Sequence, residues 1–146
     1  MLSKRTLQQL IDLAREKSDN AALVLGTTHA REREEESKLK LLENYRGECL
    51  ERFRQASSEG LDRQTWTNYH KFLAKLDAAI IQQREVVAQQ RQKTDQSRLD
   101  WQAASSRLKS FDTLGARQRR SEHAAERRRE QRVQNTVASR KRDPER

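Results

Sequence analysis

The chain has 146 residues, of which 33% are hydrophobic and 36% are charged, and its net charge is +9. So few apolar residues cannot fill the interior of a globular domain, while only 4 glycines and 1 proline are too few for a typical disordered chain. The abundance of Glu, Lys, Arg, Gln, Leu and Ala instead predicts long helices that pair along a narrow apolar seam. We therefore expect an all-α coiled coil, and the length favours a single domain over residues 1–146.

Cellular location is constrained by what the sequence lacks. No segment is apolar for long enough to cross a membrane, and the N-terminal residues have no apolar core of the secretory type. Cys49 is the single cysteine, so it has no partner for an internal disulfide, which suits a reducing compartment. We expect a cytoplasmic protein.

A first helix is predicted over residues 5–57. It begins near residues 3–6, where Thr6 and Gln9 suit a capping box. Apolar residues recur at helical spacing in its first and last thirds: Leu7, Leu10, Ile11, Leu13, Ala14, and then Leu39, Leu42, Tyr45, Cys49, Phe53. The middle, residues 26–38, is polar and exposes a charged face.

That charged middle is expected to support the helix through pairs of side chains four residues apart. The pairs are Arg31 with Glu35, Glu34 with Lys38, and Glu36 with Lys40. Each such pair contributes about 0.2–0.5 kcal/mol. A solvated helical face is favoured over a binding site here.

A turn is predicted at residues 58–61. Gly60 is the glycine at which both periodic patterns stop, and Asp62 is suited to cap the helix that follows.

The second helix is predicted over residues 62–135 and carries two apolar stripes. The first stripe is the seam: Trp66, Tyr69, Leu73, Leu76, Ile80, Val87, then the polar Gln90, Thr94 and Ser97, then Trp101, Ala104, Leu108 and Phe111. The second stripe, Phe72, Leu76, Ala79 and Gln83, lies to one side of it. Large apolar residues outside a seam often mark a contact surface, so the second stripe is a candidate binding site. Alternatively the seam is wide, and Phe72 is half-covered by Tyr45 or Cys49.

A short turn makes the two helices antiparallel, with facing residues whose numbers sum to about 120. Phe53 would then meet Trp66, and Ile11 would meet Leu108. The polar residues 26–38 would face the polar residues 83–97. The alternative is a parallel dimer, in which Ile11 faces Ile11 of a second chain.

A basic tail is predicted over residues 117–146, which contain 11 Lys and Arg against 5 Asp and Glu. Such a charge suits phosphate, an acidic lipid surface or an acidic protein lumen. No Phe, Tyr or Trp follows Phe111, so base stacking is unsupported. The alternative is a solvated tail without a partner.

Catalytic constellations are absent from the pattern. His29, His70 and His123 lie far apart, and neither a phosphate-binding glycine loop nor a metal-ligand spacing around Cys49 is present. We expect no enzymatic activity, no cofactor and no metal.

A family resemblance becomes specific between residues 66 and 83. The pattern W-x-x-Y-x-x-F-x-x-x-L-x-x-A-I from Trp66 to Ile80, with the stretch from Leu39 to Tyr45 before it, resembles the flagellar FliJ protein family. Trp101 and Leu108 continue the resemblance, which is weakest in the basic tail. It implies a non-enzymatic stalk and adaptor of the flagellar type III protein export apparatus, an antiparallel coiled coil similar to the central stalk of rotary ATP synthases.

The resemblance also implies partners and sites. The partners are the hexameric export ATPase FliI and its regulator FliH, the cytoplasmic part of the export gate FlhA, and export chaperones, at the cytoplasmic face of the inner membrane. The gate-binding patch would fall on Leu42, Tyr45, Phe72, Leu76, Ala79 and, at its edge, Gln83. Lys38, Cys49 and Gln83 depart from the family's residues at this patch.

The basic tail allows two functions. In the stalk hypothesis, Arg127, Arg128 and Arg129 meet acidic or carbonyl groups that line the ATPase ring. The alternative function is a basic coiled coil that binds nucleic acid through its C-terminal arginines.

Overall fold

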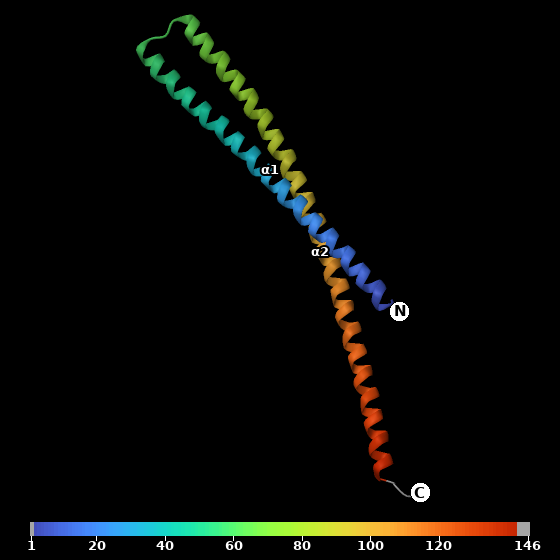
Figure 1. The fold of residues 1–146 in the computed structure, drawn as a ribbon. Helices are drawn as coiled ribbons and strands as arrows, with labels where there is room; N and C mark the ends of the chain where they lie inside the picture. Colours follow the sequence, from blue (N-terminus) through green and yellow to red (C-terminus); the bar gives the residue numbers. More distant parts are fainter. Residues whose placement is uncertain (1, 143–146) are drawn as a thin grey trace. The chain divides into compact units, whose positions relative to one another are not determined.

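The computed structural model describes residues 2–142 and consists of two helices (Figure 1). Helix α1 spans Lys4–Glu59 and helix α2 spans Arg63–Arg142, and these residues include no strand. The two helices run antiparallel, which confirms the predicted all-α hairpin. Helix α2 extends to Arg142, past the predicted end at residue 135. None of the described helices is long and apolar enough to cross a membrane.

Ser3 caps the start of α1. Its hydroxyl accepts a hydrogen bond from the Thr6 N–H at 3.1 Å and donates one to the Thr6 hydroxyl at 2.7 Å. The predicted capping box of Thr6 and Gln9 is therefore wrong, because the helix begins at Lys4 and Thr6 already lies within it. A serine oxygen that satisfies a free N–H of the first turn is a favourable N-cap.

The turn between the helices is built by Gly60 and Asp62, as predicted. Gly60 has a φ of 93°, which a residue with a side chain rarely adopts, and its N–H donates to the Ser57 carbonyl at 3.3 Å. Asp62 accepts a hydrogen bond from the Thr65 N–H at 3.2 Å, which caps α2. The Thr65 side chain and then its N–H hold the pKa of Asp62 below its ordinary value of 3.8.

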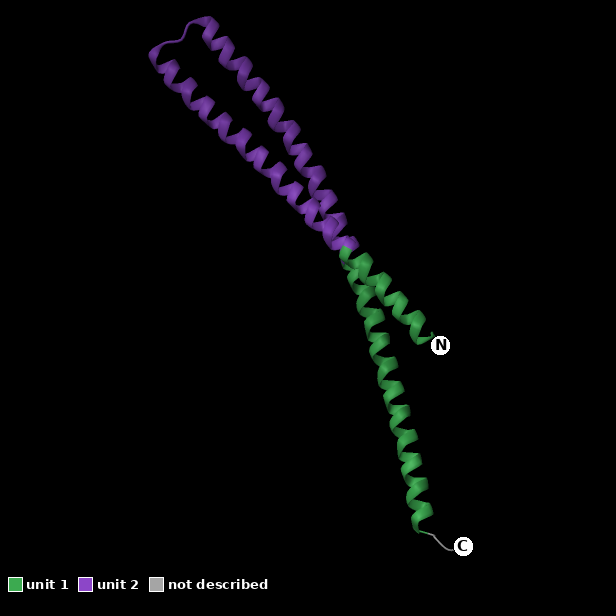
Figure 2. Ribbon diagram, viewed as in Figure 1, with its two compact units in different colours: residues 1–19, 102–146 green, residues 20–101 purple. Residues whose placement is uncertain are grey.

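The chain forms two compact units (Figure 2). Residues 20–101, with the turn, form one unit, and residues up to Asp19 together with those from Gln102 onward form the other. In the unit of residues 20–101, Cys49, Leu73 and Leu76 form a buried cluster against which Leu42, Leu50 and Tyr69 pack. The seam of α2 continues through further buried residues: Ile80, Val87, Gln90, Thr94 and Ser97.

The predicted seam is confirmed from Leu73 to Ser97 but is wrong at three of its aromatic residues, whereas Phe53, Tyr69 and Phe111 are half-buried. Trp66, Trp101 and Tyr45 are 49%, 36% and 44% exposed. Phe53 contacts Tyr69 and His70, with ring centroids 5.5 and 5.3 Å apart, where Trp66 was expected. Side chains lean toward the N-terminus of their helix, so contacts across an antiparallel pair fall further along α2 than residues at equal height.

The two polar stretches face each other, as predicted. Gln83 Nε2 donates to the Glu35 carbonyl at 3.0 Å, and Gln90 Nε2 donates to the Thr28 carbonyl at 3.2 Å. These bonds show that this part of the seam is held by hydrogen bonds where apolar side chains are missing.

The charged segment of α1 is less solvated than predicted. Lys38 pairs with Glu35 rather than with Glu34, and Glu36 pairs with Arg91 of α2. The glutamates bond across the seam because the opposing stretch of α2 offers Gln and Arg side chains at the matching height.

In the other unit, the start of α1 packs against α2 near Gly115. Leu7, Ile11 and Ala14 are buried there, and ion pairs join Lys4 to Glu122 at 3.7 Å and Arg15 to Asp112 at 3.9 Å. A Cβ atom placed on Gly115 would lie 3.2 Å from Cδ1 of Ile11. Ile11 therefore meets Gly115, about two helical turns beyond the expected Leu108.

Candidate protein-interaction sites

The most exposed aromatic contact between α1 and α2 joins Tyr45 and Phe72. The two rings pack edge to face, with centroids 5.9 Å apart and planes at 80°. Tyr45 is 44% exposed and Phe72 is 40% exposed. The pair therefore covers itself only partly, and the two rings together present an apolar surface to solvent.

The other residues of the predicted patch lie at different depths. Leu76 is buried in the core cluster, and Leu42 packs against that cluster while remaining half-buried. Ala79 and Gln83 are also half-buried. Only Tyr45 and Phe72 of the six residues are exposed, and Leu76 supports them from inside the seam.

Gln83 holds the edge of this surface in place. Its side-chain amide donates to the Glu35 carboxylate at 2.6 Å as well as to the Glu35 carbonyl. The amide of Gln83, followed by Lys38 and Arg31, lowers the pKa of Glu35 below 4.5. Gln83 therefore fixes Glu35 across the seam.

One residue of this surface was missed from sequence. Val86 is half-buried and lies seven residues after Ala79, which itself lies seven residues after Phe72. Residues at this spacing share a side of a coiled-coil helix. We call this side of the hairpin, defined by Tyr45, Phe72, Ala79 and Val86, the Phe72 flank; the repeat of seven could have revealed Val86.

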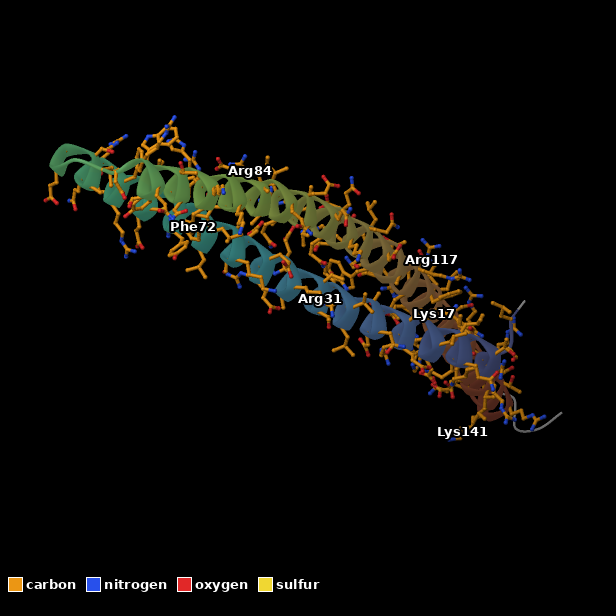
Figure 3. The ribbon with its side chains drawn as sticks, turned by 90° about the horizontal axis from the view of Figure 1, so that it is seen from above. Lys17, Arg31, Phe72, Arg84, Arg117 and Lys141 are labelled. Carbon is orange, nitrogen blue, oxygen red and sulfur yellow. The ribbon has the colours of Figure 1, made fainter. Side chains whose placement is uncertain are left out.

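The opposite flank of the hairpin carries charges that neutralise one another. Three ion pairs cross between the helices: Arg46–Asp77, Glu43–Arg84 at 3.5 Å and Glu36–Arg91 at 2.9 Å. Arg46 directly follows Tyr45 and is rotated from it by about 100° around α1. In Figure 3, Phe72 and Arg84 are labelled at opposite edges of α2.

These ion pairs make the two flanks chemically different. Their side chains are 40–63% exposed, so each pair stabilises the hairpin by only about 0–1 kcal/mol. Among the described residues, no ion pair joins α1 and α2 on the Phe72 flank. The Phe72 flank is therefore the apolar side of the hairpin, and the other flank is its charge-paired side.

A second aromatic group lies close to the turn. Trp66 packs on His70 with ring centroids 3.9 Å apart, and His70 also contacts Phe53. His29 and His123 lie elsewhere on the helices, and within residues 2–142 no group of three or more His, Cys, Asp or Glu is placed to hold a metal.

The arginines of the predicted ATPase-binding site lie on the C-terminal part of α2. Arg127, Arg128 and Arg129 are all exposed and helical. Figure 3 labels Arg117 and Lys141, which lie on either side of them in the sequence. The helical conformation gives each of these arginines a defined direction from the helix axis.

Comparisons with known proteins match nearly the whole chain. The family model described as "Flagellar FliJ protein" matches residues 3–140. A flagellar FliJ protein of Escherichia coli (strain K12) is 32% identical over 140 residues, which cover 96% of this chain and 95% of that protein. The flagellar FliJ protein of Salmonella typhi has the same identity and coverage.

Proposed function

The chain belongs to the flagellar FliJ protein family and is thereby a component of the flagellar export apparatus; we propose that it works there as a non-enzymatic adaptor. In this role it connects the export ATPase FliI and its regulator FliH to the cytoplasmic part of the export gate FlhA. It also receives export chaperones and acts at the cytoplasmic face of the inner membrane.

The observation that carries the proposal is the half-exposed pair of Tyr45 and Phe72. Aromatic side chains that stay partly exposed on a polar hairpin contribute little to folding for their size, and they are frequent hot spots of protein interfaces. Leu42 and Leu76 support the pair from the seam, and Ala79 leaves room beside Phe72 for a partner. The Phe72 flank is the proposed binding site for the export gate.

The C-terminal part of α2 is the proposed contact with the ATPase. Arg127, Arg128 and Arg129 are exposed on a helix with a large excess of positive charge. Such a surface suits carboxylates or carbonyl groups that line a protein ring. The contacts with FliH and with chaperones are proposed from the family resemblance alone, and no particular residue of this chain is assigned to them.

The gate site is tested by measuring how tightly the Phe72→Ala variant binds the cytoplasmic part of FlhA. We expect the variant to bind at least about ten-fold more weakly, as is typical for loss of an interface hot spot. Ile81→Ala is the matched control, because Ile81 is 67% exposed and lies on the charge-paired side. Its binding should stay close to that of the unmodified chain.

Two results would contradict the gate site. Equal losses of FlhA binding in Phe72→Ala and Ile81→Ala would show that the gate does not bind one flank in preference to the other. Unchanged binding in Phe72→Ala would exclude Phe72 from the contact altogether.

A further inference from the structure

Most of the charges on α2 from Arg117 to Arg142 are sorted between two faces of the helix, and Arg132 and Lys141 lie at the boundaries between these faces. At about 100° per residue, one face collects all the acidic residues of this segment together with three arginines: Arg119, Glu122, Glu126, Arg129, Glu130 and Arg140. The opposite face has five arginines and no acidic residue: Arg117, Arg120, Arg127, Arg128 and Arg142. We call them the balanced face and the arginine face.

Contacts with α1 show which way the balanced face is turned. Glu122 pairs with Lys4, and Gln118 Nε2 donates to the Leu2 carbonyl at 3.5 Å. Arg119, Gln118 and Glu122 line one depression with residues of α1 near Ile11. The balanced face therefore points toward α1 in this unit. The arginine face points away from α1 except at Arg117, which lines a depression with Leu2 and Leu7.

The same division continues beyond the part of α2 that α1 covers. Glu126, Arg129 and Glu130 line a shared depression with Val133 and Gln134. No arginine of either face forms an ion pair within residues 2–142, but only the arginine face has no acidic residue among its arginines. Arg127, Arg128 and Arg129 are consecutive, yet Arg129 belongs to the balanced face. The basic tail is thus one-sided rather than uniformly cationic.

We propose that the arginine face is a docking surface for a carboxylate-rich surface of a partner protein. This rests on the proposed contact between the tail and the export ATPase, and it assigns that contact to one face of α2. Guanidinium groups pair with carboxylates through two parallel hydrogen bonds, and here no neighbouring carboxylate on the same face competes. The small Ala124 and Ala138 lie between these arginines and allow a close approach.

A protein partner suits this surface better than a nucleic acid. Residues 112–142 contain no Phe, Tyr or Trp side chain on which bases could stack, and the chain belongs to a family of the flagellar export apparatus. An anionic membrane is also less suitable, because the exposed Val133 and Val137 lie on the balanced face and not beside the five arginines.

The test compares two double variants of the full chain that lose the same charge. Arg127→Ala with Arg128→Ala removes two arginines from the arginine face, and Arg119→Ala with Arg140→Ala removes two from the balanced face. Alanine preserves helix formation, which circular dichroism verifies. Binding to the FliI hexamer is measured for both at several salt concentrations, with duplex DNA and phosphatidylserine vesicles as comparison probes.

We expect the first variant to bind FliI about ten-fold more weakly and to show a shallower salt dependence, and the second to stay within about two-fold of the unmodified chain. Equal losses in the two variants would overturn the assignment to one face but leave the tail as the contact. An unmodified chain that does not bind FliI would instead refute the proposed function. Loss of DNA or vesicle binding in the first variant, with FliI binding retained, would reassign the arginine face to a phosphate ligand.

Discussion

The Thr94 hydroxyl of α2 lies 3.2 Å from the Thr28 carbonyl of α1, at the most deeply buried side chain of the described residues. Thr94 is 1% exposed, and its hydroxyl is also 3.1 Å from the Gln90 carbonyl of its own helix. The Thr28 carbonyl accepts a second bond from Gln90 Nε2. A polar residue that is hydrogen-bonded across the two helices therefore occupies a seam position at which coiled coils usually have an aliphatic residue.

Replacing Thr94 separates the role of its shape from that of its hydroxyl. Thr94→Val keeps the branched shape, and the Thr28 carbonyl retains Gln90 as a donor, so the melting temperature should stay the same or rise. Thr94→Ala leaves a void in the seam and should lower it. Thermal unfolding followed by circular dichroism measures both. An equal loss in the two variants would show that the hydroxyl itself is required.

Phe72 and Leu73 are adjacent but should differ sharply in their effect on stability. Leu73 is 8% exposed within the core cluster, so Leu73→Ala should cost about 2–5 kcal/mol of unfolding free energy. Phe72→Ala should cost clearly less, because the ring is 40% exposed and its removal opens no enclosed cavity. Urea denaturation gives both values. If Phe72→Ala is as damaging as Leu73→Ala while gate binding per folded molecule is preserved, Phe72 is a core residue and not a binding residue.

Glycines at different places in the hairpin should respond in opposite directions to alanine. Gly47 lies inside α1 with no other atom within 4 Å of an added Cβ, so Gly47→Ala should stabilise the protein by about 0.5–1 kcal/mol. Gly60 has a positive φ, and Gly60→Ala should destabilise it. Melting temperatures compare the two. A loss of stability in Gly47→Ala would reveal a packing role that the structure does not contain.

Acid should weaken the hairpin through Asp62 and Glu35. Each has a pKa below its ordinary value of 3.8 or 4.5, so its contribution is complete above that value and is lost as the pH falls through the lower, folded-state pKa. Stability should therefore drop below about pH 4. Asp62→Asn keeps a side-chain cap that does not titrate. Between pH 5 and pH 3 the melting temperature of this variant should therefore fall less than that of the unmodified chain, and the difference measures the contribution of Asp62. A drop identical to that of the unmodified chain would show that the cap has no part in the acid response.

The sequence predicted what depends on helical period and on turn chemistry. Leu73, Ile80 and Val87 repeat every seven residues and are buried, and Gly60 with Asp62 marks the turn. It did not predict the depth of Trp66 or the contact of Ile11 with Gly115. Both features depend on the direction in which side chains leave the helix and on the distance between the helices, and a pattern of apolar residues predicts neither.

The candidate sites were predicted to a different extent. The stripe of Phe72, Leu76 and Ala79 was visible in the spacing, but its separation into an exposed Phe72 and a buried Leu76 required the structure. The ion pairs of the charge-paired side were missed, because α1 alone offered nearer partners for its glutamates. The one-sided tail was not predicted for another reason: Arg127, Arg128 and Arg129 are adjacent in the sequence, but consecutive residues of a helix point in different directions.

The hydrogen bonds that Gln83 and Gln90 make to carbonyls of α1 have a consequence for how this protein can change over evolutionary time. Every residue type carries a main-chain carbonyl, so positions 28 and 35 can exchange their side chains while still accepting these bonds. A glutamine donor, in contrast, cannot be exchanged for an aliphatic residue without losing its bond. Keeping these hydrogen bonds therefore restricts the residue types allowed on α2 more than those allowed on α1. Neutral substitutions in this part of the seam should accumulate faster on α1 than on α2.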